Sequence, residues 1–184
     1  NYNALASTTG YQAVASATGY HSVANASGYL SAAVSTGDNA VSYATGFMGI
    51  ASSVGKNSVA GSSSLLGIAA ITGVNGVACV AGEKGIAAST GNISTAYASG
   101  NVSMAGNTGQ QGAAIATNAS AAAIATGLQG KVKGAEGSAL FLAYRNPLTD
   151  KILHTWSGIV GQKGVKPDVF YALTKTGKLI EVAE

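Results

Sequence analysis

A nine-residue repeat runs without interruption through the first 135 residues, and it limits what this chain can fold into more than any other feature. Division at the regularly spaced glycines gives fifteen units, and the first position is Gly in twelve of them; Asn1, Ser64 and Asn118 are the exceptions. Gly and Asn both tolerate a positive φ, so the first position predicts a turn. A period of this kind is typical of a solenoid, in which each repeat stacks on its neighbours.

Residues between the turns alternate in size with the period of two that a strand has. The fourth position is always Ala, Ser or Gly, and the sixth is Ala in thirteen units, with Ser42 and Val132 as the exceptions. The eighth is also mostly small, as in Ala17 and Ala26, whereas the fifth is usually Val, Ile or Leu. A helix is the competing interpretation because Ala is the best helix former, but a Gly in every unit would cost about 1 kcal/mol each.

The pattern therefore predicts an all-β fold, a parallel β-solenoid or β-roll in which two nine-residue repeats make one coil. About seven and a half coils at roughly 4.8 Å give a rod on the order of 36 Å long. Because packed interiors tolerate little change in volume, the least variable positions, four and six, are predicted to lie inside. The Val and Ile of position five then form an outward apolar ladder, which indicates association of the solenoid with copies of itself as a trimer. With the two faces reversed, a monomer is expected.

The composition changes at Glu136, because 11 of the 17 charged side chains lie in the last 49 residues. The chain is therefore divided into a solenoid, residues 1–135, and a C-terminal module, residues 136–184. Four strands are predicted in the module, near residues 138–144, 151–160, 165–173 and 178–182. They are expected to form a small antiparallel β unit that caps the open end of the last coil, with a docking tip as the alternative.

Aromatic side chains supply the candidate contact residues. These are Tyr2, Tyr11, Tyr20 and Tyr29 in the repeats and Trp156, Phe170 and Tyr171 in the C-terminal module. The four tyrosines occupy the second position of the first four units, so they are predicted to stack in two columns at the corners, either for stability or for contact with carbohydrate. The aromatic residues of the module are candidates for a docking surface, and packing in its core is the alternative.

The chain offers few groups for catalysis, so we expect no enzyme, no catalytic residues and no cofactor. Its two histidines are His21, at a corner, and His154, for which an acid–base pair with Asp150 or Asp168 is the alternative to a solvent-exposed position. Carboxylates are too sparse in the solenoid for glycoside hydrolysis, and the repeats lack the Asp ladder of calcium-binding β-rolls. With Cys79 as the only cysteine, we expect no metal site.

Charge and hydropathy argue against two further classes of partner. A net charge of +3 without a basic cluster predicts no nucleic-acid partner, and the chain has no long apolar run for membrane insertion. Thr or Ser at position nine suggests a flat hydroxyl array that binds ice, but its place beside the turn glycine favours hydrogen bonds at the corner instead.

Two resemblances bear on function. Residues 57–61, Asn-Ser-Val-Ala-Gly, resemble the head repeats of YadA-type trimeric autotransporter adhesins, left-handed parallel β-rolls that trimerise, although the repeat length differs. The units at residues 10–18 and 19–27, together with segments 137–143 and 164–173, resemble uncharacterised phage and prophage proteins in which G-x-x-A-x-x-A-S-S strings precede a short β domain. The resemblances imply a trimer and a phage context, and they supply no catalytic residues.

The sequence therefore predicts a non-enzymatic structural protein, a trimeric β-solenoid fibre or capsid decoration of a phage. It would lie on the virion or an extracellular surface, with copies of itself and other virion proteins as partners. The alternative is an adhesin that recognises a cell-surface glycan or receptor through the tyrosine columns or the C-terminal tip.

Overall fold

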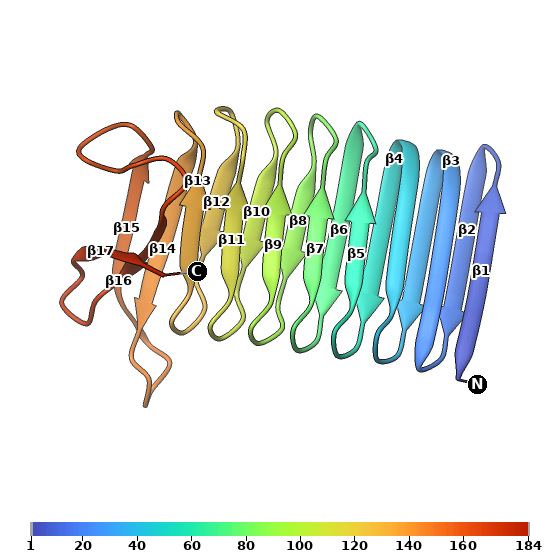
Figure 1. Ribbon diagram of the computed structural model, residues 1–184, viewed down its shortest axis with the longest axis horizontal. Helices are drawn as coiled ribbons and strands as arrows, with labels where there is room; N and C mark the ends of the chain where they lie inside the picture. Colours follow the sequence, from blue (N-terminus) through green and yellow to red (C-terminus); the bar gives the residue numbers. More distant parts are fainter. Residues whose placement is uncertain (1, 184) are drawn as a thin grey trace.

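The computed structural model describes residues 2–183, and this part of the chain consists of strands and connections with no helix. Asn1, the first position of the first repeat, lies outside the described residues. Strands stack in chain order along one axis to form a rod of about eight coils, and the C-terminal strands lie at the opposite end from the N-terminus (Figure 1). The predicted all-β parallel solenoid is confirmed.

Strand lengths change along the rod. The solenoid strands are β1 (Asn3–Thr9), β2 (Gln12–Thr18), β3 (His21–Thr36), β4 (Val41–Val54), β5 (Val59–Ser62), β6 (Leu66–Thr72), β7 (Val77–Val80), β8 (Ile86–Ser89), β9 (Thr95–Ala98), β10 (Met104–Asn107), β11 (Ala113–Ala116), β12 (Ala122–Ala125), β13 (Lys131–Gly134) and β14 (Ala139–Arg145). They are followed by β15 (Ile152–Ile159), β16 (Phe170–Leu173) and β17 (Leu179–Val182). The long strands β3 and β4 each continue around a corner, whereas most later solenoid strands have four residues.

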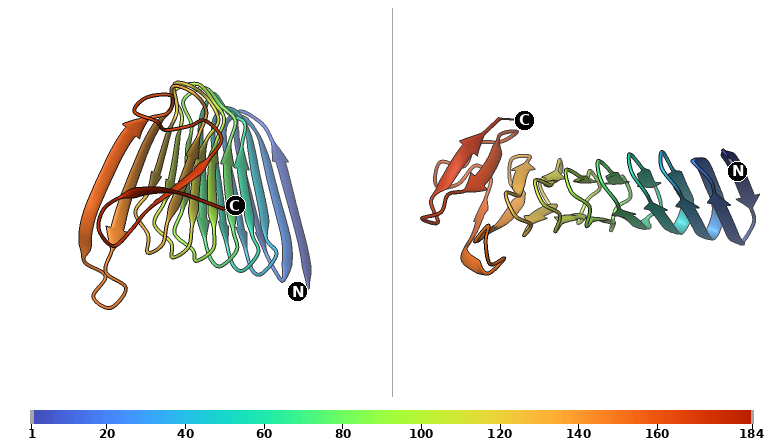
Figure 2. Two further views of the ribbon diagram at one scale, coloured as in Figure 1. Left: turned by 60° about the vertical axis from the view of Figure 1, so that its left-hand side comes forward. Right: turned by 90° about the horizontal axis from the view of Figure 1, so that it is seen from below.

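Parallel pairing joins residues 18 apart, for example Ala6 with Ala24 and Ala69 with Ala87, so two nine-residue units make one coil as predicted. The ladder forms two sheets that enclose a thin interior (Figure 2). The β1 sheet contains β1, the first parts of β3 and β4, and β5, β7, β9, β11 and β13. The β2 sheet contains β2, the second parts of β3 and β4, and β6, β8, β10, β12 and β14.

Small side chains fill the interior of the solenoid. The alanines of position six, such as Ala24, Ala69 and Ala105, are completely buried, and positions four and eight also point inward. Some buried serines bond to the facing strand, as where the Ser42 hydroxyl donates to the carbonyl of Ser52 at 2.6 Å, and others bond to their own corner, as where the Ser58 hydroxyl donates to the carbonyl of Gly55 at 2.7 Å. The prediction that the small ladders lie inside is confirmed, and the side chains of position five point outward.

The corner glycines are required mainly by close approach of the backbone. A Cβ atom on Gly91 would lie 1.4 Å from the carbonyl oxygen of Gly73, one coil earlier. The left-handed residue of the corner is more often at position three: Asn39, Asn57 and Asn75 have φ between 54° and 57°. The predicted turn is present. Glycine is needed at position one chiefly because the corners of adjacent coils stack closely, and less because this residue has a left-handed conformation.

The C-terminal module closes the end of the rod. β14 pairs in parallel with β12, which extends the solenoid ladder beyond residue 135, with Ala122 opposite Ala139. β15 then pairs antiparallel with β14, β16 meets β13 through Val132 and Tyr171, and β17 pairs antiparallel with β16. The third strand was predicted over residues 165–173, but it begins at Phe170 because the preceding residues form turns.

Candidate functional site

An apolar groove runs along the outer face of the β2 sheet. Two outward ridges form its walls, one from position three and one from position five of alternate repeats. Its lining includes Gln12, Val14, Leu30, Ala32, Met48, Ile50, Leu66, Ile68, Lys84 and Ile86, and its volume is about 590 Å³. The ridges come from β2, β3, β4, β6 and β8, so the groove follows the rod axis across five stacked strands. Outward placement of Val and Ile, predicted from position five, produces this surface.

Polar residues bound the groove at both ends. In the ridge of position three, Leu30, Met48 and Leu66 lie between Gln12 and Lys84. Residues 1–37 carry no charged side chain, and Lys84 is the one charged residue among those that line the groove. An apolar centre with polar ends is the usual composition of a protein–protein contact.

A column of aromatic rings lies beside the groove, at position two of the same repeats. The ring centroids of Tyr11 and Tyr29 are 5.1 Å apart and those of Tyr29 and Phe47 are 4.9 Å apart, with 3° between the planes in both pairs. Tyr2 and Tyr20 form the second column, edge to face at 6.4 Å. The two predicted columns are therefore present. Sequence reasoning missed Phe47, although its position, 36 residues after Tyr11, gave the signal.

The outer face of the β1 sheet is more polar. Asn39, Asn57 and Asn75 form a ladder at position three. The side-chain amide of Asn57 donates to Oδ1 of Asn39 at 3.4 Å, and that of Asn75 donates to Oδ1 of Asn57 at 3.3 Å. Cys79 lies half-buried on this sheet, and burial raises the pKa of its thiol, which keeps it in the unreactive protonated form at neutral pH. The apolar groove is lined by residues of the β2 sheet and by none of these strands.

Hydroxyls at position nine form some of the predicted corner hydrogen bonds. The side chain of Thr90 donates to the carbonyl of Ile71 at 3.5 Å, and that of Ser99 donates to the carbonyl of Val80 at 3.3 Å. In both pairs the acceptor belongs to the preceding coil, so these bonds strengthen the stacking of corners.

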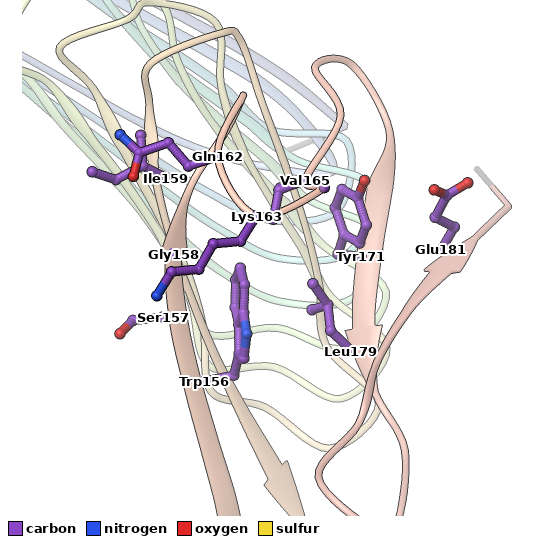
Figure 3. Close-up of a pocket in the computed structure, with 11 residues that line it drawn as sticks. Trp156, Ser157, Gly158, Ile159, Gln162, Lys163, Val165, Tyr171, Leu179 and Glu181 are labelled. Carbon is purple, nitrogen blue, oxygen red and sulfur yellow. The ribbon is translucent and has the colours of Figure 1, made fainter.

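A second hollow, of about 610 Å³, lies in the C-terminal module between β15, the loop of residues 161–165 and the β16–β17 hairpin. Trp156 and Leu179 face each other across it, and the side chain of Lys163 extends toward β15 (Figure 3). Glu181, on the far wall, forms a 2.8 Å ion pair with Lys166. This ion pair and its hydrogen bond raise the pKa of Lys166.

The aromatic candidates of the module differ in exposure. Tyr171 is only 3% exposed, and its hydroxyl accepts a hydrogen bond from the backbone N–H of Lys166 at 2.7 Å. Phe170 is also buried, with the ammonium of Lys131 4.5 Å from its ring centroid. Both belong to the core of the module instead of an exposed tip, because β16 covers the last coil. Trp156 is partly exposed at the wall of the hollow.

The histidines lie apart from any acid–base partner that the structure records. His21 packs edge to face on Tyr20 at 4.6 Å, and His154 lies 6.3 Å from the ring of Tyr144. Within residues 2–183, no group of three or more His, Cys, Asp or Glu is arranged to hold a metal ion. The same residues include no helix with the length and hydropathy needed to cross a membrane.

In comparisons with protein-family models, curated proteins and solved structures, this chain matches none of them. The groove of the β2 sheet and the hollow beside β15 are therefore interpreted from their own geometry.

Proposed function

We propose that this chain is a non-enzymatic structural protein, a β-solenoid rod that assembles laterally with copies of itself through the groove of the β2 sheet. The observation that carries the proposal is the row of large apolar side chains on the outside of a fold whose own interior is filled mainly by small ones. Ile50 and Ile68, for example, are 48% and 40% exposed. Exposed apolar surfaces of this extent mark association sites in soluble proteins.

The shape of the groove favours a second copy as its occupant. Each copy carries a ridge of position-five side chains with the spacing of stacked strands, about 4.8 Å. The side chains of this ridge are spaced along the rod as the strands that line the groove of another copy are. Contacts made by one coil can therefore recur at each following coil. Polar Gln12 and Lys84 at the two ends would set the limits of the buried part.

An assembly of three copies and a phage context are part of the proposal, and the resemblance to YadA-type heads and to phage repeat proteins supports them. A bundle of three rods, with the β2 sheets at its centre, would serve as a fibre or capsid decoration on a virion or extracellular surface. The aromatic columns and the C-terminal module would then face solvent and other virion proteins.

An adhesin that binds a cell-surface glycan is the second candidate function, and the stacked column of Tyr11, Tyr29 and Phe47 favours it. The rings are parallel and stacked, so the outer face of a terminal ring and the exposed ring edges are the apolar surfaces that a sugar ring could pack against. Glycan-array binding that disappears in the Tyr11→Ala/Tyr29→Ala variant would support this function over a purely structural one.

Lateral assembly is tested by the mass of the protein in solution. Sedimentation equilibrium at micromolar concentration should give an assembly with three copies side by side, and Ile50→Asp/Ile68→Asp should reduce that mass threefold because it places two charges in the groove. The matched control is Val59→Asp/Val77→Asp, which changes the same repeat position on the β1 sheet, where Val59 and Val77 are each 39% exposed. A monomeric wild-type chain, or an equal effect of the control, would contradict the proposal.

A further inference from the structure

We propose that the free edge of β15 is a binding site for an extended segment of a partner protein, which adds to it as one further β-strand. The site lies in the C-terminal module at the end of the rod and uses none of the residues in the groove of the β2 sheet. It is therefore independent of lateral assembly.

One edge of β15 lacks a strand partner among the described residues. β15 pairs only with β14, with Leu140 opposite Gly158 and Leu142 opposite Trp156. The N–H of Val160 donates to the carbonyl of Ser138 at 3.0 Å, which sets the phase of the ladder. In an antiparallel pair alternate residues face the partner, so the even-numbered residues of β15 bond to β14 and Thr155 and Ser157 direct their N–H and C=O groups away.

A second hydrogen bond supports this phase. The carbonyl of Ile159, another odd-numbered residue, points away from β14 and accepts from the N–H of Gln162 at 3.1 Å. A row of alternating donors and acceptors along an exposed strand is complementary to the backbone of another extended chain.

The edge also lacks the features that usually protect such strands. β15 is eight residues long and contains no Asp, Glu, Lys or Arg, whereas natural edge strands are commonly short, charged or interrupted. β17, the outer strand of the other sheet, fits that protected pattern, since it has four residues and includes Glu181. The difference singles out β15 as an edge suited to pairing.

The hollow beside β15 would receive side chains of the added strand. Trp156, Val165 and Leu179 supply apolar walls to it (Figure 3). Alternate side chains of an extended segment point to the same face, so one of them would enter the hollow while its neighbours stay in solvent. The site therefore selects an apolar side chain at one position of the partner.

Charge fixes a second position of the partner. Glu181 is already paired with Lys166, whereas within residues 2–183 no ion pair involves Lys163, whose side chain extends toward β15 beside the hollow. A carboxylate two residues from the apolar side chain, on the same face of the segment, would complement Lys163. The expected partner is thus an extended segment with an apolar and an acidic residue two positions apart, on the same face.

The surroundings of the edge favour a single segment over a second solenoid. The loop after β15 and the turn between β16 and β17 both project past β15 along the rod axis (Figures 1 and 2). These projections form a shelf beside the edge, which a single extended chain can occupy and which obstructs the approach of another complete coil.

The test selects a displayed library of random octapeptides on the full chain and measures the enriched peptides by fluorescence of Trp156, the only tryptophan. Enriched peptides should share an apolar residue and an acidic residue two positions apart, and their binding should shift the Trp156 emission to shorter wavelength. Ser157→Pro removes an outward N–H at a position where an edge strand tolerates proline, and it should weaken binding about tenfold or more. Ser157→Val keeps the N–H and should bind as the wild type does.

A second variant guards against a folding defect. Lys163→Glu should shift the selected peptides from acidic to basic residues without changing the circular dichroism of the chain. Failure to enrich any peptide, or enriched peptides that bind Ser157→Pro as tightly as the wild type, would overturn the proposal. Trp156 emission that depends on the concentration of the chain alone would also overturn it, because that result assigns the edge to a second copy.

Discussion

The solenoid and the C-terminal module belong to one continuous ladder of strands, yet their interiors are built from side chains of different size. Position six of the repeats buries alanine almost throughout, whereas the last coil and the module bury Leu140, Leu142, Val160 and Tyr171. In the solenoid, mainly methyl groups separate the two sheets, so their backbones lie close together. In the module, leucine and tyrosine side chains separate the elements, so their backbones lie further apart. The difference indicates that backbone stacking stabilises the solenoid and that side-chain burial stabilises the module.

The solenoid and the module should therefore be destabilised by different kinds of substitution. Adding a single methyl group at a corner of the solenoid meets backbone atoms of the neighbouring coil, which have no rotamer through which to yield. Removing methyl groups from the module leaves a cavity that its neighbours fill only in part. A substitution that enlarges a side chain in the solenoid and one that shortens a side chain in the module therefore test this difference between the two regions.

Gly91→Ala should have the largest effect. Its Cβ atom would lie 1.4 Å from the carbonyl oxygen and 2.3 Å from the carbonyl carbon of Gly73, so the two coils would have to separate. We expect the free energy of unfolding to fall by about 4 kcal/mol or more, in the range seen when a native backbone contact cannot form. Urea denaturation followed by far-ultraviolet circular dichroism measures this change.

Gly106→Ala is the matched control, because the nearest atom to a Cβ atom on Gly106 is the carbonyl oxygen of Ala87 at an ordinary 3.9 Å. Alanine restricts the unfolded chain more than glycine does, so this variant should be unchanged or more stable by about 0.5 kcal/mol. Equal losses in the two variants would show that any residue larger than glycine is excluded from the repeat, and stacking at the corner would no longer explain the glycines.

Leu140→Ala should have the next largest effect and should act on the module. Leu140 is completely buried where β14 completes the last coil, and deletion of a side chain at such a site removes about 2–5 kcal/mol of stability. Trp156 lies on the adjacent strand β15, so its fluorescence should report the loss at lower urea than the circular dichroism of the repeats.

Leu148→Ala provides the comparison, since Leu148 lies in the connection between β14 and β15 and is 92% exposed. Its stability should stay within about 0.5 kcal/mol of the wild type. If Leu140→Ala were equally mild, side-chain burial would not be the source of stability in the module.

Much of the solenoid follows from its sequence because each position of the repeat recurs in the same environment. Fifteen examples of position six define the interior better than any single alanine does, and the period of nine fixes the pairing of Ala6 with Ala24. The aromatic columns follow in the same way, since residues 18 apart must lie in adjacent coils. The outward apolar ridge was also predictable from position five.

The module has no such redundancy, and its sequence predicted less. Val165 and Val169 are typical strand residues, but Lys163 and Asp168 have left-handed φ values of 50° and 58°. The N–H of Asp168 donates to the carbonyl of Gly134, which holds this segment against the last coil. The free edge of β15 and the hollow beside it depend on which strand pairs with which, and one sequence without repeats does not determine that.

Position three of the repeat distinguishes local backbone preference from side-chain packing within the solenoid. Substitutions there are expected to change the free energy of unfolding least. Asn39, Asn57 and Asn75 take the left-handed conformation readily, but the next residue in this ladder is Ile93, with φ of 54°. A β-branched side chain is strained in this region by about 1 kcal/mol relative to Asn. Ile93→Asn should therefore raise the free energy of unfolding by about 1 kcal/mol, as measured by urea denaturation.

Val102→Asn distinguishes relief of strain from extension of the amide ladder. Val102 has φ of 52° and lies at position three in a repeat of the β2 sheet, where its neighbours one coil away are Lys84 and Ser120 instead of amides. Relief of strain alone predicts equal gains for the two variants, whereas a larger gain for Ile93→Asn would measure its added hydrogen bond to Asn75. A loss of stability in Ile93→Asn would mean that packing of the exposed isoleucine outweighs the strain of its backbone, and the local conformation would then be subordinate to side-chain contacts even in the solenoid.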